Sequence, residues 1–486
     1  MNVIEKRINY YRDANVRARV LEFIGTSASG EPSCEFLAGG DENAQPPFKP
    51  YSQQSLNLLL DGGLEICRSL WDREVLIADF DIEYVNFDNS AEAFTVAERI
   101  LAIQQPVENV IKQLLRDYGI QARHVLSGRG HHFVWQIEQN SDEFKELAAL
   151  GRGPPSLWVA ENGPHPPNGR AVPHELARAF AGLGLVMEFF AHRVKLIAAP
   201  LATVPVELTA VEVEPSNHGR EMISVDISEY GDPLYSRMIR VPFSTYLKPW
   251  QQPWGFAANV LAKLQPLFVI PLQGINWCEG ISIRRDHQLT AHLAAHTTTN
   301  IPDSTRSTDK LLRDYQKSKL ARFHAFFYSQ EQHPAELWPQ TYDRTPLEIL
   351  PSCARVALEQ PNDLLLRPAS IRRLVRVMLA LGWHPRHIAG LICSKYKRDF
   401  GWTQFVHVDP AARADFYTRV FAGLFAAGTD DLLDFNCVSA QEQGTCTFST
   451  CGHNLLNFKE SALKRREHDK LAHRPFNRLL LSSEHS

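Results

Sequence analysis

Apolar and polar residues alternate along VLIADFDIEYVNFD, residues 75–88, after an apolar beginning. This pattern predicts a β-strand over 75–83. Side chains two residues apart in a strand point to the same face, so Asp79, Asp81 and Glu83 are expected to project together. Like charges repel, and acids beside a core are costly unless a positive group neutralises them. A bound divalent cation is the simplest neutraliser.

A helix and a hairpin are predicted after this strand. PVENVIKQLLRDYG has apolar residues at helical spacing, with Pro106 suited to the helix start and Gly119 to its end. ARHVLSGRGHHFVWQI reads as strand, glycine turn and strand. The segment therefore predicts a β-α-β-β unit with a helix on one side of a sheet.

Other segments are predicted more coarsely. Residues 151–170 are rich in Pro and Gly, which indicates a surface excursion, and a helix is expected near 174–192. Strand-like residues return from about 221, and helical patterns dominate from about 255. The charge-rich residues 303–323 indicate a linker or exposed helices, and the last third, from about 345, is mostly helical.

Length and composition set the broad class. The chain has 486 residues, 44% apolar and 22% charged, which is typical of a folded protein with two or three domains. Its net charge of −4 means that nucleic-acid binding would need local basic patches. The charged N-terminus is unlike a signal peptide, no apolar run is long enough for a membrane span, and eight cysteines do not indicate a disulfide scaffold. We expect a cytoplasmic protein.

The acids on the predicted strand are candidate metal ligands. Carboxylates are hard oxygen ligands that suit Mg²⁺ or Mn²⁺. A D-x-D pair such as Asp79 and Asp81 is by itself a weak pattern, because exposed acids at strand ends are common.

Two later segments add phosphate-binding residue types. SGRGHHFVW places Ser127, Arg129 and His132 around a flexible turn, although a glycine-rich hairpin with a core histidine has the same pattern. SVDIS supplies a third acid, Asp226. RMIRVPFSTYLK, which alone reads as an amphipathic edge strand, carries four more such residues, namely Arg237, Arg240, Ser244 and Lys248.

The ordered set resembles the catalytic core of the archaeo-eukaryotic primase superfamily, over residues 70–250. The resemblance implies that Asp79, Asp81 and Asp226 hold two divalent ions for nucleotidyl transfer. It further implies that the triphosphate is bound by six residues, namely Ser127, Arg129, His132, Arg240, Ser244 and Lys248. The chain departs from the family at Tyr246, where a histidine is frequent. Residues 133–225 contain no cysteine, so we expect no zinc knuckle there.

Four cysteines form a second candidate site: Cys353 in LPSCARVALEQ, and Cys437, Cys446 and Cys451 in CVSAQEQGTCTFSTCGHN. Their spacing alone favours zinc or no metal. The gaps exceed those of ordinary zinc sites, and buried cysteines without a ligand are the simpler alternative. Residues 345–460 resemble the C-terminal domain of the primase large subunit, which implies a [4Fe–4S] cluster, with Zn²⁺ as the alternative. The remaining cysteines, Cys34, Cys67, Cys278 and Cys393, are expected in cores.

The segment SIRRLVRVMLALG predicts an amphipathic helix with Arg372, Arg373 and Arg376 away from its apolar face. These arginines form either a solvated surface or contacts to template phosphates. Both interpretations place them in water.

The sequence thus predicts an α+β fold, with a primase-type catalytic core of mixed β-sheets flanked by helices and a mainly α-helical iron–sulfur domain after it. The expected divisions are an N-terminal part of the catalytic module, the core, a helical linker region, the iron–sulfur domain and a basic tail, at 1–70, 71–255, 256–344, 345–460 and 461–486.

The expected function is that of a primase-polymerase, which makes primers from nucleoside triphosphates on a single-stranded DNA template. Replication or repair proteins are possible further partners, and no membrane is expected. The alternatives are a gap-filling or repair polymerase that does not initiate, a non-catalytic single-stranded nucleic-acid-binding protein, and a metal-dependent nuclease.

Overall fold

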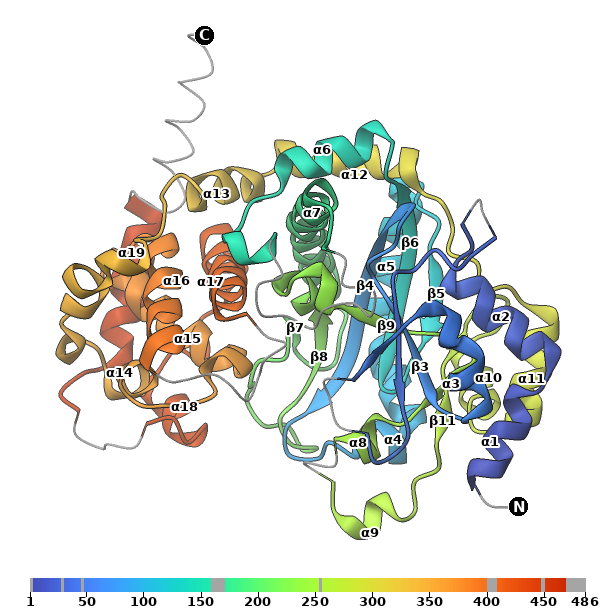
Figure 1. Ribbon diagram of the computed structural model, residues 1–486. Helices are drawn as coiled ribbons and strands as arrows, with labels where there is room; N and C mark the ends of the chain where they lie inside the picture. Colours follow the sequence, from blue (N-terminus) through green and yellow to red (C-terminus); the bar gives the residue numbers. More distant parts are fainter. Residues whose placement is uncertain are drawn as a thin grey trace.

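The computed structural model describes residues 3–27, 30–44, 48–158, 171–252, 256–399, 409–446 and 451–468. The expected α+β class is confirmed: three β-sheets lie beside numerous helices (Figure 1). Most of the Pro/Gly-rich excursion, residues 159–170, and most of the basic tail, residues 469–486, lie outside the described residues.

A six-stranded sheet forms the centre of the molecule, in the order β12-β5-β6-β4-β8-β7. Every neighbouring pair is antiparallel except β7 and β8. The predicted strand and hairpin are confirmed as β4, β5 and β6. The strands are β4 (Val75–Asn86), β5 (Arg123–Leu126), β6 (Gly130–Glu138), β7 (Val206–Leu208), β8 (Glu221–Asp226) and β12 (Ile270–Pro271).

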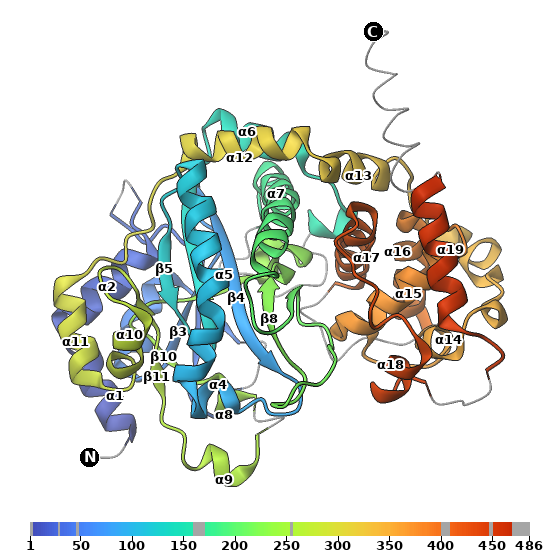
Figure 2. The ribbon, with the colours of Figure 1, turned by 180° about the vertical axis from the view of Figure 1, so that it is seen from behind.

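The two faces of β4 have different surroundings. Phe80 packs edge-on against Phe190 of α7 (His174–Ala198), with ring centroids 4.8 Å apart. This face is also covered by α5 (Ala97–Tyr118), as Figure 2 shows. Asp79 and Asp81 alternate with Phe80 along the strand and therefore point to the opposite face of the sheet.

The helix after β4 begins earlier than predicted. α5 starts at Ala97 rather than at Pro106, which lies inside it, and ends at Gly119 in the left-handed conformation as expected. Buried residues before the proline, Ile100 and Leu101, continue the apolar stripe formed after it. Packing of that stripe outweighs the loss of one backbone hydrogen bond at proline.

A four-stranded sheet, β2-β1-β3-β9, and a two-stranded sheet, β10-β11, lie beside the central one. Their strands are β1 (Leu37–Gly40), β2 (Pro50–Tyr51), β3 (Glu65–Ser69), β9 (Met238–Arg240), β10 (Thr245–Tyr246) and β11 (Leu267–Phe268). The adjacent helices are α1 (Val3–Tyr11), α2 (Ala14–Ile24), α3 (Leu56–Asp61), α4 (Glu92–Thr95), α8 (Lys248–Gln251) and α9 (Ala258–Leu261).

The region after residue 255 is less uniformly helical than expected. β11 belongs to the two-stranded sheet and β12 to the six-stranded sheet, so residues 267–271 are part of the sheet architecture. The charge-rich stretch forms α12, which buries Leu311, Leu312 and Tyr315, and α13. The helices here and across the top of the molecule are α6 (Asp142–Leu150), α10 (Trp277–Ile283), α11 (His287–His296), α12 (Thr305–Lys317) and α13 (Lys319–Phe327).

The last third is helical, as predicted, and lies to one side of the sheets (Figure 1). Its helices are α14 (Ser352–Glu359), α15 (Pro368–Ala380), α16 (Pro385–Ser394), α17 (Pro410–Ala427), α18 (Cys437–Glu442) and α19 (Leu455–His468). Ion pairs join it to the rest of the chain: Arg413 contacts Asp232, and Arg419 contacts the fully buried Glu188 of α7.

The predicted basic face of α15 is wrong. Arg372, Arg373 and Arg376 are buried inside the helical part. Arg376 pairs with Asp430 and Asp434, and Arg372 pairs with Asp434. The sequence pattern failed because the neutralising acids lie more than fifty residues further along the chain.

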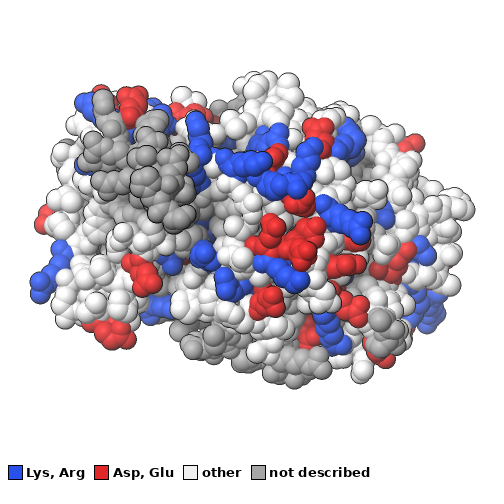
Figure 3. All heavy atoms as spheres, turned by 90° about the horizontal axis from the view of Figure 1, so that it is seen from above, with Lys and Arg blue, Asp and Glu red and all other residues white. Residues whose placement is uncertain are grey.

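No helix among the described residues is long and apolar enough to cross a membrane. On the face seen in Figure 3, basic and acidic side chains are interspersed. The described part of this face therefore carries no extended field of one sign, in keeping with the small net charge.

Candidate functional site

The three predicted aspartates lie together on adjacent strands. Asp81 of β4 is directly opposite Asp226 of β8 on one side and His132 of β6 on the other. Residues directly opposite in an antiparallel pair have Cβ atoms about 5 Å apart. Asp79 lies two residues before Asp81 on the same face, and its Oδ2 is 3.0 Å from His132 Nδ1. The structure thus brings together residues from three distant motifs.

This cluster holds excess negative charge. The pKa of Asp81 is raised by burial; His132 lowers it, and the carboxylates of Glu83, Asp226 and Asp79 raise it. Burial lowers the pKa of His132, but Asp81 and Asp79 outweigh that effect and raise it. His132 is therefore held as an imidazolium, which pairs with Asp79 and Asp81.

A further carboxylate, Glu229, was missed by sequence reasoning. Its Oε1 is buried without a hydrogen-bond partner, and its pKa is raised by burial and then by the charge of Asp79. The next residue, Tyr230, donates its hydroxyl to the Asp79 carbonyl oxygen at 2.7 Å. The only sequence signal was the position of Glu229 three residues after Asp226, which strand periodicity does not interpret.

Basic side chains lie beside the acids. Arg129 donates from Nε and Nη2 to both oxygens of Glu83, each at 2.6 Å. Arg240 of β9 donates from Nε to the buried Glu65, and its guanidinium lies 4.7 Å from the centroid of the Tyr246 ring. Both arginines are therefore fixed in position by other side chains.

Lys248 differs because its ammonium has no hydrogen bond or ion pair with any described residue, although its backbone carbonyl accepts from Gln252. Its pKa is lowered to about 8, first by the positive charge of Arg129 and then by burial, while Glu83 acts in the opposite direction. An unpaired, partly buried ammonium next to two guanidinium groups favours an anionic ligand.

Three residues of the predicted phosphate-binding set have other partners. The Ser127 hydroxyl donates to the Gly130 carbonyl across its own turn, at 3.2 Å. Ser244 is fully buried, and its hydroxyl accepts from the Ile66 N–H at 2.7 Å. Arg237 pairs with Asp232. Ser244 is thus a structural residue in this arrangement, because its side chain is sealed between β3 and β10.

The donor set of the acid cluster fits a hard divalent cation. Asp81 Oδ1 and Glu229 Oε1 are both buried, and neither has a hydrogen-bond partner. Carboxylate oxygens are the ligands that Mg²⁺ and Mn²⁺ prefer. Across the ranges listed above, no three His, Cys, Asp or Glu side chains surround a common point as they would around an ion. The fit rests on the chemistry of the donors and on their unsatisfied oxygens.

The four candidate cysteines lie in the helical part, and no three of them, all being described, surround a common point as they would around a bound metal. The pKa of Cys353 is raised to about 11 by burial; Arg373 lowers it, and the thiols of Cys446, Cys437 and Cys451 raise it. All eight cysteines of the chain are described, and none forms a disulfide. As predicted for core residues, Cys34, Cys67 and Cys393 are buried, whereas Cys278 is exposed.

The surroundings of these cysteines fit a group held by several thiolates. Arg373 has a buried Nη1 with no partner, and its charge acts on Cys353. The Leu455 N–H points to Cys437 Sγ at 3.4 Å, as backbone donors do toward thiolates. A buried cation and backbone donors both stabilise the negative charge that thiolates carry.

Comparisons of this chain with protein-family models, curated proteins and solved structures found no match.

The site combines two halves with opposite charge. Asp79, Asp81 and Asp226 form an acidic half suited to cations, and Arg129, Arg240 and Lys248 form a basic half suited to phosphate. A ligand that carries a polyphosphate with bound cations matches both halves at once.

Proposed function

We propose that this protein is a single-chain primase-polymerase, which joins nucleoside triphosphates on a single-stranded DNA template. The observation that supports it most is the register of β4 and β8, which sets Asp81 opposite Asp226 with Asp79 on the same face. Two nearby acids in one motif are common in proteins, but a third acid from a distant motif, beside a basic cluster, fits nucleotidyl transfer.

Asp79, Asp81 and Asp226 would hold Mg²⁺ or Mn²⁺. Such cations, when bound, polarise phosphoryl oxygens and lower the pKa of an attacking hydroxyl. His132 pairs with both Asp79 and Asp81 and offsets part of the repulsion between these two carboxylates.

Arg129, Arg240 and Lys248 would bind the triphosphate. Both arginines are prepaired with glutamates, which fixes their orientation before the substrate arrives. Lys248 has no partner to give up and gains an ion pair on binding. In this proposal Ser127 stabilises the turn through its hydrogen bond to Gly130, and Arg129 contacts the phosphates.

Cys353, Cys437, Cys446 and Cys451 would hold a [4Fe–4S] cluster, with Zn²⁺ as the alternative. All-thiolate sites suit both groups. The helical part that carries them would support initiation by engaging template, and its tether to the sheets raises its effective concentration there.

The deciding experiment incubates the protein with single-stranded template, Mn²⁺ or Mg²⁺ and labelled ribo- or deoxynucleotides without primer. We expect oligonucleotide products with the wild type and with Asp142→Asn, an exposed acid on α6, and none with Asp79→Asn. Products that require a supplied primer favour a gap-filling polymerase. Template shortening without synthesis favours a nuclease, and binding alone favours a non-catalytic protein.

The metal group is tested separately. Anaerobically purified protein is expected to be brown, and the colour should be lost in Cys446→Ser and kept in the control Cys278→Ser. Colourless protein with one equivalent of zinc, lost in Cys446→Ser, would replace the iron–sulfur assignment by zinc.

A further inference from the structure

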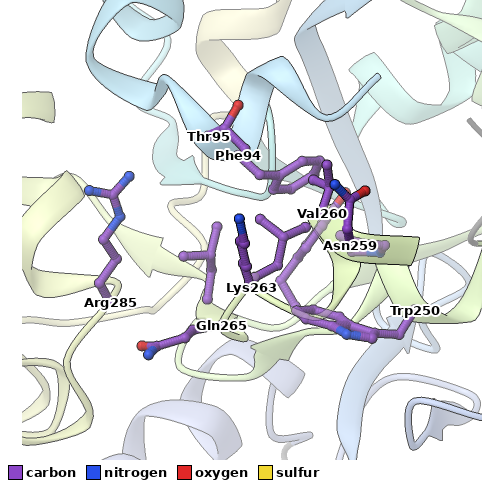
Figure 4. Close-up of a pocket in the computed structure, with 12 residues that line it drawn as sticks. Phe94, Thr95, Trp250, Asn259, Val260, Lys263, Gln265 and Arg285 are labelled. Carbon is purple, nitrogen blue, oxygen red and sulfur yellow. The ribbon is translucent and has the colours of Figure 1, made fainter. Parts of the chain in front are cut away.

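A cavity of about 520 Å³ lies beside the basic half of the site, between α4, α8, α9 and β11. Cavities of this size accommodate small organic ligands. Figure 4 shows its lining side chains, which come from segments far apart in the sequence. The lining includes Phe94, Tyr246, Trp250, Lys263 and Arg285.

Aromatic rings form much of the wall. Phe94 and Tyr246 have ring centroids 6.0 Å apart at an interplanar angle of 33°. Trp250 is partly exposed, and in Figure 4 it and Phe94 lie on opposite sides of Lys263. Aromatic side chains on a cavity wall suit a flat ring, which they bind by stacking.

The charge of the lining is positive. None of the lining residues is an Asp or Glu. Lys263 is exposed and has no ion pair with a described residue, and its amine points toward Phe94 and Thr95 in Figure 4. Among the described residues, Arg285 pairs through Nη1 with the exposed Glu98, at 3.3 Å. The cavity therefore favours a ligand that carries both a flat ring and negative charge.

Tyr246 is a wall shared by this cavity and the carboxylate site. One side of its ring contacts the Arg240 guanidinium, and another lines the cavity. A Cβ added at Gly128 would lie 2.0 Å from the ring, so the Ser127–Gly130 turn packs directly on it. Arg284, beside Arg285, donates to the Gly128 carbonyl oxygen at 2.6 Å.

We propose that this cavity binds a nucleobase of single-stranded nucleic acid, with Lys263 contacting an adjacent phosphate. The proposal rests on the proposed function, because the shared Tyr246 wall places the base next to the site that would act on the strand. Base–aromatic stacking tolerates any base, and phosphate contacts carry no sequence information. The cavity therefore holds a strand without reading its sequence.

The test measures binding of a fluorescent single-stranded oligonucleotide and of the same backbone without bases, in a chelator and without nucleotides. Wild type is expected to prefer the strand with bases. Trp250→Ala should weaken binding of that strand about five- to a hundredfold and leave the abasic strand unchanged, whereas Trp250→Phe keeps most of the preference. Lys263→Ala should weaken both strands and lower the salt dependence, unlike the exposed control Lys145→Ala.

Each outcome decides the proposal. If Trp250→Ala melts like the wild type and keeps its preference for bases, the cavity does not bind the strand's bases. A loss of affinity for a free nucleoside triphosphate, with strand binding unchanged, assigns the cavity to the base of a mononucleotide and overturns the strand assignment. If the protein makes no product but binds bases through Trp250, the proposed function is wrong and the base-binding cavity stands.

Discussion

Replacing Arg376 with methionine tests how the helical part is held together. Arg376 is 2% exposed, and it donates from Nε to Asp430 at 2.8 Å and from Nη1 to Asp434 at 2.9 Å. Methionine fills similar space without charge, so both aspartates lose a buried cation. Removing one partner of a buried ion pair costs about 3–5 kcal/mol, because it leaves an uncompensated charge.

Thermal or denaturant unfolding measures this loss. The matched control is Arg367→Met, because Arg367 is 70% exposed and pairs only with Asp363 one turn away. We expect that control to change stability by less than about 1 kcal/mol. A double variant, Arg376→Met with Asp430→Asn, should recover part of the loss, since Asp434 keeps its pair with Arg372 and the substitution removes the aspartate that has lost its arginine.

Binding to single-stranded DNA separates this explanation from a phosphate contact. An arginine that contacts phosphate weakens binding when removed and lowers the salt slope by about 1. The buried geometry predicts an unchanged slope for folded Arg376→Met. Normal unfolding of this variant, together with weaker and less salt-dependent binding, would refute the reasoning.

Three further predictions follow from the sheets and the helices that pack on them. Glu229→Gln should raise the thermal midpoint of the metal-free protein, because it removes repulsion with Asp79, and weaken Mn²⁺ binding measured by calorimetry. Burial lowers the pKa of His192 to about 4, so the unfolded chain binds the proton more readily, and stability should fall by about 3 kcal/mol in denaturant titrations as pH drops from about 6.5 to 4. Gly128→Ala should lower the free energy of unfolding, measured by thermal denaturation, by about 1–3 kcal/mol, because the added Cβ would clash with the Tyr246 ring.

Each of these has a contrary outcome. Glu229→Gln with the Mn²⁺ affinity of the exposed control Glu175→Gln would remove Glu229 from the acid cluster. His192→Gln should flatten the acid dependence more than His287→Gln, an exposed histidine, and equal dependence would assign it to other groups. An unchanged midpoint for Gly128→Ala would contradict the packing of the turn on Tyr246.

Local patterns predicted the parts of the fold that local physics determines. Alternation identified β4, and the glycine turn identified the hairpin of β5 and β6. Gly119 ends α5 as expected, because only glycine adopts its left-handed conformation at low cost. The start of α5 was mispredicted because proline usually marks a boundary, whereas here the apolar stripe on both sides of Pro106 is long enough to keep the helix continuous.

Partners that lie far away in sequence explain the other differences. Arg376 looked solvated because Asp430 cannot be matched to it before the fold is known. Glu229 follows β8 in a 3₁₀ turn, Ser228–Gly231, whose geometry alone turns it toward Asp79. The aromatic cavity was likewise invisible, since Phe94 and Trp250 belong to segments with no common pattern.

The acid cluster itself follows from the rule that folds the sheet. Val225 is opposite Ile82 on the apolar face, and Asp226 is opposite Asp81 on the polar one. A slip of one residue between β4 and β8 would turn Asp226 toward the core and Val225 toward the acids. That exchange costs both the burial of an unpaired charge and the exposure of an apolar side chain. The hydrophobic pattern that pairs the strands therefore also sets the carboxylates side by side, against their mutual repulsion.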